Sequence, residues 1–263
     1  MAGGNDGQEM REPVIQVKNL YKVYRMGDTK VYALNGVDFT IYKGEFCAIT
    51  GPSGSGKSTL LKAVNRTAEE YGAKVSGTVT LDGENAFSLP AEALRRRIGM
   101  VFQTPVTFPF SIYKNMLYAP KYFKRFTKAQ ADELVSLYLK KAGLYEEVKD
   151  QLGMPATRLS GGQQQRLAIA RCLTVEPEIL LLDEPCSALD VKNTAHIEKL
   201  LLELKADYTI LIVTHNLAQA RRIADAVIYM EDGEIIEAGT PDELFGAPKD
   251  ERTKAYLAYL AGN

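Results

Sequence analysis

The stretch Gly51-Pro52-Ser53-Gly54-Ser55-Gly56-Lys57-Ser58-Thr59 constrains this chain more than any other part of its sequence. It fits the pattern Gly, four residues, Gly-Lys and Ser or Thr, in which backbone N–H groups surround a phosphate. Residues 45–50 before it predict a buried strand, and residues 60–64 after it have helical composition. An ordinary glycine-rich turn is the alternative, but such a turn would not require a strand before it and a helix after it. We therefore predict that Lys57 contacts the β- and γ-phosphates of a nucleotide and that Ser58 ligates Mg²⁺.

The composition argues against several classes of protein. With 32 Lys and Arg against 33 Asp and Glu, the formal net charge is −1, which gives no basis for expecting nucleic acid as a partner. The three cysteines, Cys47, Cys172 and Cys186, are too few and too widely spaced for a disulfide framework or a metal cluster. No apolar run reaches about 18 residues, so we expect no bilayer-spanning segment, and any link to a membrane would require a partner protein.

Strand-like and helix-like segments alternate along most of the chain, which predicts a mostly parallel sheet with helices on its faces. Residues 14–24 and 31–41 flank a turn at 26–28 and predict an antiparallel β layer beside that sheet. Residues 111–159 predict an inserted helical subdomain, in which Thr127 and Gln130 form a capping box at the start of a helical stretch over 127–149. The three arginines at 95–97 are interpreted as a solvated helix face.

An acidic pair follows a continuous apolar run, since Asp183 and Glu184 come directly after Ile-Leu-Leu-Leu at residues 179–182. In a nucleotide-binding sheet, ligands collect at the carboxyl ends of the parallel strands. We predict that Asp183 holds Mg²⁺, directly or through water, and that Glu184 orients or deprotonates an attacking water, as phosphoryl transfer requires. A surface acid pair is the alternative, which the phosphate loop upstream disfavours.

A second distinctive stretch, Leu159-Ser160-Gly161-Gly162-Gln163, places a serine hydroxyl and two glycines at the start of a predicted helix. Backbone N–H groups at such a start bind anions. The chain therefore offers two phosphate sites that are far apart in the sequence. A simple explanation is that each site serves a different face of the same nucleotide and that the two come from different subunits.

The order of these motifs resembles the ATPase subunit of an ABC transporter, over nearly the whole chain from Ile15 to Leu260. Leu159 to Gln163 matches the signature motif of that family letter for letter. Tyr24 stands where the family stacks an aromatic ring on adenine, although Tyr24 or the nearby Tyr21 can also be a packing residue. The other correspondences are Gln103 with the Q-loop glutamine, Asp183 and Glu184 with the Mg²⁺ strand and catalytic glutamate, Ser187-Ala188-Leu189-Asp190 with the D-loop, and His215 with the switch histidine.

The resemblance implies an α/β fold with a mostly parallel P-loop NTPase sheet, an antiparallel β layer and an inserted α-helical subdomain. It also implies how the chain divides. Residues 1–12 are expected to be a flexible tail, and residues 13–263 a single nucleotide-binding domain. Within that domain we expect a RecA-like core at about 13–103 and 160–263 and the helical subdomain at about 104–159.

The resemblance further implies the site and its partners. ATP would lie between the Lys57 loop of one copy and the Ser160 stretch of a second copy placed head to tail, with Mg²⁺ as cofactor. The implied catalytic residues are Glu184 as base, His215 on the γ-phosphate, Gln103 and Lys57. The implied nucleotide-binding residues are Tyr24, residues 51–59 and residues 160–163. The implied Mg²⁺ ligands are Ser58, Gln103 and Asp183. The other implied partners are two membrane-spanning permeases and an extracytoplasmic solute-binding protein, with the chain peripheral on the cytoplasmic face of the membrane.

The cargo is less well specified, and we expect inorganic phosphate. Four stretches resemble the phosphate-import branch of the family, namely residues 81–85, 103–115, 159–166 and 204–209. The Pro- and Phe-rich part of the second stretch is interpreted as the surface that meets a membrane subunit, with a core-packing loop as the alternative.

Three departures keep other readings open. Cys186 replaces the usual Thr or Ser, residues 118–126 are unusually rich in Tyr, Phe and Lys, and residues 24–42 resemble the lipoprotein-release and macrolide-export branch. An exporter or lipoprotein-release ATPase is therefore the alternative function. A soluble ABC-type ATPase of translation or DNA repair is disfavoured, because the chain has one set of motifs and no heptad run.

Overall fold

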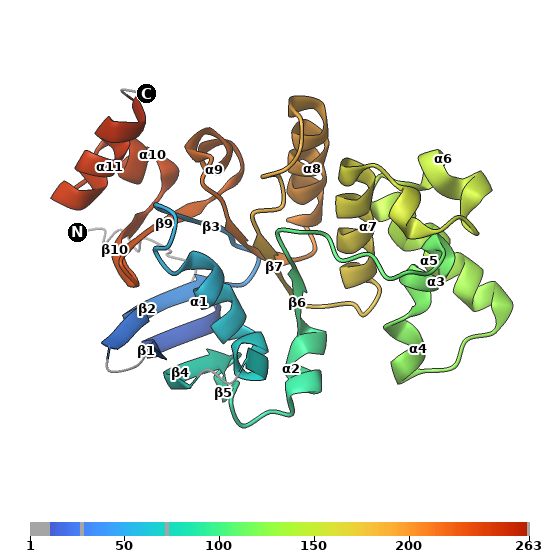
Figure 1. Cartoon of the computed structure of the whole chain (residues 1–263), viewed down its shortest axis with the longest axis horizontal. Coiled ribbons are helices and arrows are strands. Elements are labelled where there is room, and N and C mark those ends of the chain that lie inside the picture. Colours follow the sequence, from blue (N-terminus) through green and yellow to red (C-terminus); the bar gives the residue numbers. More distant parts are fainter. Residues whose placement is uncertain (1–10, 27–28, 72–73, 262–263) are drawn as a thin grey trace, which may run out of the picture.

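A six-stranded sheet lies at the centre of the computed structural model, which describes residues 11–26, 29–71 and 74–261 (Figure 1). Five of its strands are parallel, and β10 pairs antiparallel with β9 at one edge. The strand order is β10 (Glu234–Gly239), β9 (Ala226–Glu231), β3 (Phe46–Thr50), β8 (Thr209–Val213), β7 (Ile179–Asp183) and β6 (Ile98–Val101).

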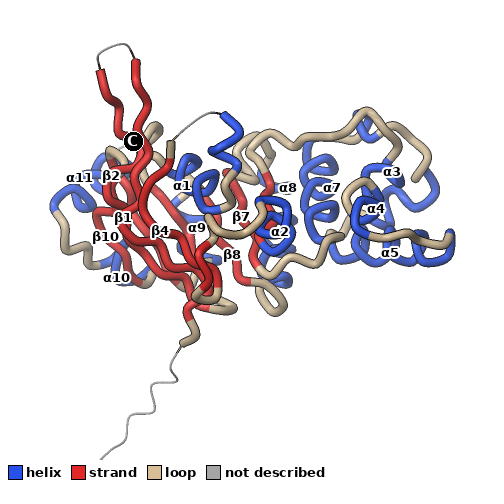
Figure 2. Tube along the Cα trace, turned by 90° about the horizontal axis from the view of Figure 1, so that it is seen from below, coloured by secondary structure: helices blue, strands red, loops and turns tan. Residues whose placement is uncertain are grey.

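A second, antiparallel sheet faces the first one, with helix α1 (Lys57–Val64) between them (Figures 1 and 2). Leu60 and Leu61 of α1 pack in one buried cluster with Ile15 and Ile41 of the antiparallel sheet and with Leu181 of β7. The strand order of this sheet is β2 (Thr29–Tyr42), β1 (Pro13–Met26), β4 (Val75–Leu81) and β5 (Glu84–Asn85). The fold class predicted from the sequence is thus confirmed, including the antiparallel layer.

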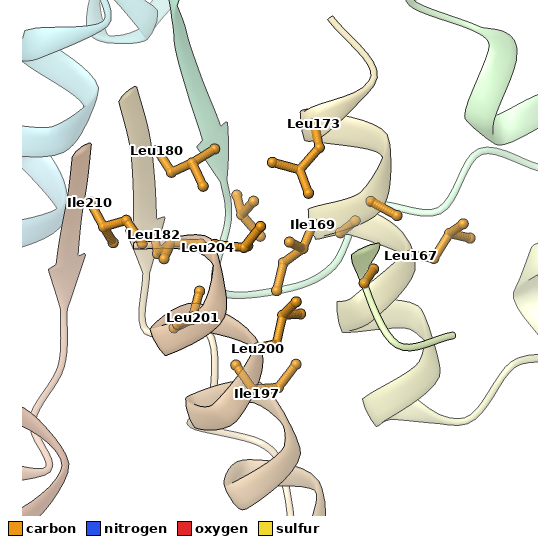
Figure 3. Packing of buried hydrophobic residues seen from close by; sticks show 14 of the residues in the cluster. Leu167, Ile169, Leu173, Leu180, Leu182, Ile197, Leu200, Leu201, Leu204 and Ile210 are labelled. Carbon is orange, nitrogen blue, oxygen red and sulfur yellow. The ribbon is translucent and has the colours of Figure 1, made fainter. Parts of the chain in front are cut away.

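The central strands are buried on both faces because their side chains alternate between two cores. In β7, Leu181 faces the cluster around α1, whereas Leu180 and Leu182 face the cluster built by α7 (Gly161–Leu173) and α8 (Val191–Leu204). Figure 3 shows Leu180 and Leu182 beside these two helices. Helix α7 is therefore fixed to the same strand that ends in the acidic pair.

A group of short helices covers α7 on the side away from α8, at the right of Figure 1. It comprises α3 (Ile112–Leu117), α4 (Pro120–Phe123), α5 (Lys128–Lys141) and α6 (Tyr145–Val148). The capping box of Thr127 and Gln130 is confirmed. The helical stretch expected over 127–149 is interrupted at residues 142–144, so that it consists of α5, α6 and the start of a 3₁₀ turn. Gly143, at a φ of +61°, and Leu144 donate to the carbonyls of Lys140 and Leu139, which is the hydrogen-bond pattern of a Schellman C-cap.

The remaining helices are α2 (Ala91–Arg97), α9 (Leu217–Ile223), α10 (Pro241–Gly246) and α11 (Glu251–Ala261), with short 3₁₀ turns at Thr67–Tyr71, Lys149–Gln151 and Ala156–Arg158. Of these helices, α9 contacts the central strand β3, α10 and α11 contact the edge strand β10, and α2 contacts the edge strand β6. Within the described residues, no helix has both the length and the apolar character needed to cross a bilayer. Residues 1–10 of the expected tail and the turn residues 27–28 lie outside the described part, and the division into core and helical subdomain stays a prediction.

Gly99 of β6 allows α7 to approach the sheet closely, because a Cβ at this position would lie 2.3 Å from Sγ of Cys172. We expect Gly99→Ala to lower the free energy of unfolding by about 2 kcal/mol, the usual cost of overpacking a core. Gly153→Ala is the matched control, since a Cβ there meets nothing within 4 Å and should change stability by less than about 0.5 kcal/mol. Urea denaturation measures both, and equal stability of the two variants would contradict this account of the packing.

Candidate active site

The predicted phosphate loop runs from the end of β3 to the start of α1. Gly51 and Gly56 have φ angles of +144° and +98°. A Cβ on Gly51 would lie 2.0 Å from the carbonyl oxygen of Met230, and one on Gly56 would lie 2.4 Å from that of Ala33. Only glycine satisfies both conditions at these two positions. The loop is therefore held in place between β9 and β2.

Lys57 places its ammonium group inside this loop. Its Nζ atom donates to the carbonyl oxygens of Gly51 and Pro52, at 2.8 and 2.6 Å, and to Oγ of Ser55 at 3.2 Å. Burial lowers the pKa of Lys57, and the charges of Glu184 and Asp183 oppose that shift. The loop thus combines one buried amine with the free backbone N–H groups of a helix start, a combination suited to phosphate.

Asp183 and Ser58 form the oxygen-rich part of the site. Oγ of Ser58 donates to Oδ1 of Asp183 at 2.6 Å, and the carboxylate is buried. Burial raises the pKa of Asp183, while the hydrogen bond from Ser58 lowers it by less. The described residues contain no group of three or more His, Cys, Asp or Glu that could hold a metal alone. These donors still fit Mg²⁺, which binds through one or two protein oxygens together with phosphate oxygens.

Glu184, Gln103 and His215 meet at the same edge of the central sheet. Each follows the carboxyl end of a parallel strand, β7, β6 and β8, and these strands are neighbours in the order β8-β7-β6. Nε2 of Gln103 donates to Oε2 of Glu184 at 2.9 Å, and Nδ1 of His215 lies 3.3 Å from the same oxygen. Glu184 is held at a φ of +45° and its backbone N–H donates to Val213. Two polar side chains therefore orient one carboxylate.

Ser187 also lies beside Glu184 and Gln103, although its stretch was identified from the sequence only by its resemblance to the D-loop. Its Oγ donates to the carbonyl oxygen of Glu184 at 3.1 Å and accepts from Gln103 at 3.4 Å.

A cavity of about 590 Å³ opens beside Glu184 and His215, and half-buried Cys186 lines it. Burial raises the pKa of the Cys186 thiol to about 11, so the thiol stays neutral where the family usually has a hydroxyl.

The stretch from Ser160 to Gln163 forms the start of α7. Oγ of Ser160 accepts from the backbone N–H of Gln163, and Oε1 of Gln163 accepts from the backbone N–H of Ser160 at 2.9 Å, which is a capping box. Nε2 of Gln163 donates to Glu147 at 2.9 Å. Both polar atoms of the Gln163 amide are thus used inside the chain, whereas Ser160 and Gly161 are exposed. Glu147 was missed because nothing in its spacing connects it with this stretch.

The two predicted anion sites do not meet within one chain. Among residues 11–26, 29–71 and 74–261, no hydrogen bond or ion pair joins residues 160–163 to residues 51–59. The first site lies at the end of β3, and the second lies at the tip of α7, which packs against the helical group. A single copy therefore presents the two stretches as separate surfaces.

Tyr24 lies on the β1–β2 hairpin beside the phosphate loop. It pairs with Val31, two residues before the Ala33 carbonyl that crowds Gly56. Tyr24 is 42% exposed, and Nζ of Lys22 lies 4.8 Å from the centroid of its ring. Tyr21 instead lies over Gly36, with its hydroxyl 2.9 Å from where a Cβ would be. Of the two tyrosines considered from the sequence, Tyr24 is the more exposed, since Tyr21 is 36% exposed.

The sequence and fold of this chain are similar to those of known proteins. The family model described as ABC transporter matches residues 34–187, which is more than half of the chain. This chain belongs to the ABC transporter family. Two solved dimeric structures of the cassette MJ0796 are also similar to it. One is described as a post-hydrolysis state bound to ADP and Pi, with 34% identity and a TM-score of 0.75, and the other as a bacterial ABC transporter cassette, with 35% identity and a TM-score of 0.76. Each match covers 86% of this chain and 98% of the MJ0796 chain.

Membership of the ABC transporter family makes this chain an ATP-hydrolysing cassette of a transport system. The phosphate loop and the cluster around Glu184 are the parts of the described structure that have the chemistry for that reaction. They contain a buried amine and an oriented carboxylate, two kinds of group that phosphoryl transfer uses.

A groove of about 1260 Å³ lies between α2 and β6 on one side and α4 and α7 on the other. The Phe108 ring lies against Tyr118, with centroids 4.5 Å apart, and Arg171 lies 4.5 Å from the Phe108 centroid. Phe110, Tyr118 and Tyr122 nevertheless remain 40%, 56% and 70% exposed. The Phe-rich segment is therefore packed against itself only in part and leaves an aromatic surface.

Proposed function

We propose that this chain is the ATP-hydrolysing subunit of a membrane importer for inorganic phosphate. The single observation that supports its catalytic part is the carboxylate of Glu184, oriented by Gln103 and His215 at the strand edge that also carries Asp183. Glu184 accepts a proton from the attacking water while the water oxygen bonds to the γ-phosphorus. The bond from that phosphorus to the β–γ bridging oxygen breaks, and its electron pair leaves with ADP.

The other residues of the site bind and orient the reacting groups. Lys57 and the backbone N–H groups of residues 51–59 hold the β- and γ-phosphates, and His215 contacts the γ-phosphate. Ser58, Asp183 and Gln103 would hold Mg²⁺, which would neutralise charge on the phosphate oxygens. Tyr24 stacks on the adenine ring. The short bond between Ser58 and Asp183 and the exposed position of Tyr24 support these roles.

The complete site requires two copies of this chain, arranged head to tail. The stretch Ser160, Gly161, Gly162 and Gln163 of one copy then covers the nucleotide held by the Lys57 loop of the other. Two features support this arrangement: the exposed position of Ser160 and Gly161 at a helix start, and the dimeric state of the MJ0796 cassettes, one of them bound to ADP and Pi.

The membrane partners are two permeases, and a solute-binding protein delivers the cargo to them outside the cell. The permeases dock on the aromatic groove between α2 and α4, which places this chain on the cytoplasmic face of the membrane. The exposed side chains of Tyr118 and Tyr122, which line this groove, support docking there, because aromatic side chains are enriched at the centres of protein interfaces.

Phosphate as the cargo is supported by the sequence stretches 81–85, 103–115, 159–166 and 204–209. An exporter or lipoprotein-release system is the second candidate, and residues 24–42 favour it. We expect affinity purification of the tagged chain from its own membranes to recover a permease pair. Vesicles containing that complex should take up radiolabelled phosphate when ATP is supplied on the side of this chain.

The Glu184→Gln variant is the control for this transport assay, because it should assemble with the permeases but drive little uptake. ATP-driven movement of another solute, or release of a lipoprotein, would contradict phosphate import while leaving the ATPase function intact. Recovery of ribosomes or DNA in place of permeases would contradict the membrane assignment.

A further inference from the structure

Glu147 is tied to the start of α7 by hydrogen bonds from two side chains. Its Oε2 accepts from Nε2 of Gln163 at 2.9 Å and from Nη2 of Arg166 at 3.0 Å, and its Oε1 accepts from Nη1 of Arg166 at 2.7 Å. Gln163 in turn accepts from the backbone N–H of Ser160. A continuous chain of bonds therefore connects Glu147 of α6 with the backbone of Ser160.

We propose that Glu147 is a positioning residue, which fixes Ser160 and the first turn of α7 for contact with a nucleotide held by a second copy. The proposal rests on the two-copy site described under the proposed function. Glu147 does not touch the nucleotide, and it acts through Gln163. The amide of Gln163 can rotate about its side-chain bonds, and Glu147 holds it in the orientation that presents Oε1 to Ser160.

The pairing with Arg166 makes this anchor rigid. The Arg166 side chain is only 7% exposed, and its Nη1 also donates to the carbonyl oxygen of Gly143 at 2.7 Å. A bidentate guanidinium–carboxylate pair fixes both the position and the plane of the carboxylate. The hydrogen bond from Arg166 holds the pKa of Glu147 below its usual range, so the carboxylate is ionised at neutral pH.

The geometry matters because a tip that reaches across to another copy must be placed accurately. Misplacement of a catalytic contact by about 1 Å can cost on the order of a hundredfold in rate. Ser160 is supported by Gln163 and by the helix that follows it, and the Gly161-Gly162 pair adds no side chain that could fix its position. The bond to Glu147 supplies the restraint from the other side, through the helical group.

The test uses Glu147→Gln in the full chain, with Glu146→Gln as the matched control. Glu146 is the preceding residue of the same helix, with a 76% exposed side chain paired to Lys149. Glu147→Gln retains the size of the side chain, but its amide N–H₂ group would face the N–H donors of Gln163 or Arg166 in place of an accepting oxygen. We expect its ATP turnover, and its ATP-dependent dimerisation in a Glu184→Gln background, to fall about tenfold, as for the loss of one charge-assisted hydrogen bond.

The affinity of the separate copies for ATP, measured at concentrations below those of dimer formation, should stay unchanged, because the Lys57 loop is intact. Gln163→Met, which keeps helix propensity but removes both amide bonds, should reproduce the loss. The double variant should lose no more than either single variant, since both act on Ser160 through one route. Glu146→Gln should match the parent chain in every measurement.

Several results would overturn the proposal. One is parental turnover and dimerisation in Glu147→Gln. Another is a loss of dimerisation in Glu147→Gln that Gln163→Met does not share, because Arg166 alone would then explain it. Failure of the parent chain itself to dimerise with ATP, while it still hydrolyses ATP, would instead contradict the two-copy site.

Discussion

Glu184→Gln is expected to bind ATP as tightly as the parent chain but to hydrolyse it about a thousandfold more slowly. General base catalysis contributes roughly a hundred- to ten-thousandfold to a rate, and an amide cannot accept the proton of the attacking water. The substitution should disturb the site little. The amide oxygen can still accept the bond that Nε2 of Gln103 now makes to the carboxylate at 2.9 Å.

Because turnover stops before the nucleotide is cleaved, this variant should also accumulate as a dimer when ATP is added. Phosphate release measures the rate, and size-exclusion chromatography with and without ATP measures the dimer. Glu178→Gln is the matched control, since Glu178 directly precedes β7 at the end opposite Glu184 and pairs with Arg97. It should cost some stability and leave turnover unchanged. Hydrolysis by Glu184→Gln at the parental rate would show that Glu184 is not the base.

The local parts of this site could be predicted from the sequence because each depends on neighbouring residues. An apolar run followed by a polar residue predicts a strand with a functional side chain at its carboxyl end, and Gln103, Glu184 and His215 all follow such runs. That these three strands are neighbours in the sheet could not be read from the sequence, because the order β8-β7-β6 is a property of the topology.

The contacts that the sequence did not predict join residues that are far apart along the chain. The carbonyl of Met230 fixes Gly51, and Glu147 holds Gln163, yet no spacing rule connects either pair. The interpretation of residues 95–97 as a solvated face was wrong for Arg97, which pairs with Glu178 and Asp82. It was also wrong for Arg95, which donates to the backbone carbonyls of residues 65 and 66. Arg96 does remain exposed, against the ring of Phe123. Arginines with distant carboxylate partners cannot be told from solvated ones by local pattern.

Ser160→Arg is expected to leave ATP binding by a single copy unchanged but to weaken ATP-dependent dimerisation about a hundredfold, in the range of the strongest interface substitutions. Ser160 is exposed at the start of α7, so the longer side chain fits the isolated chain without a clash. In a head-to-tail pair, however, the same position faces the nucleotide of the other copy, and an arginine would occupy that space. Turnover should fall in parallel with the dimer.

Loss of the helix cap is a competing explanation for such a result, because Ser160 also accepts from the backbone N–H of Gln163. Thr127→Arg separates the two explanations. Thr127 forms the same type of capping box at the start of α5, so its replacement costs a comparable cap at a helix not assigned to the nucleotide. Both variants should lose about 1 kcal/mol of stability in denaturation experiments, and only Ser160→Arg should lose the dimer.

If Ser160→Arg dimerises with ATP as well as Thr127→Arg does, the two anion sites do not share a nucleotide. No hydrogen bond or ion pair joins residues 160–163 to residues 51–59 within the described part of one chain, so the stretch around Ser160 would then need another role.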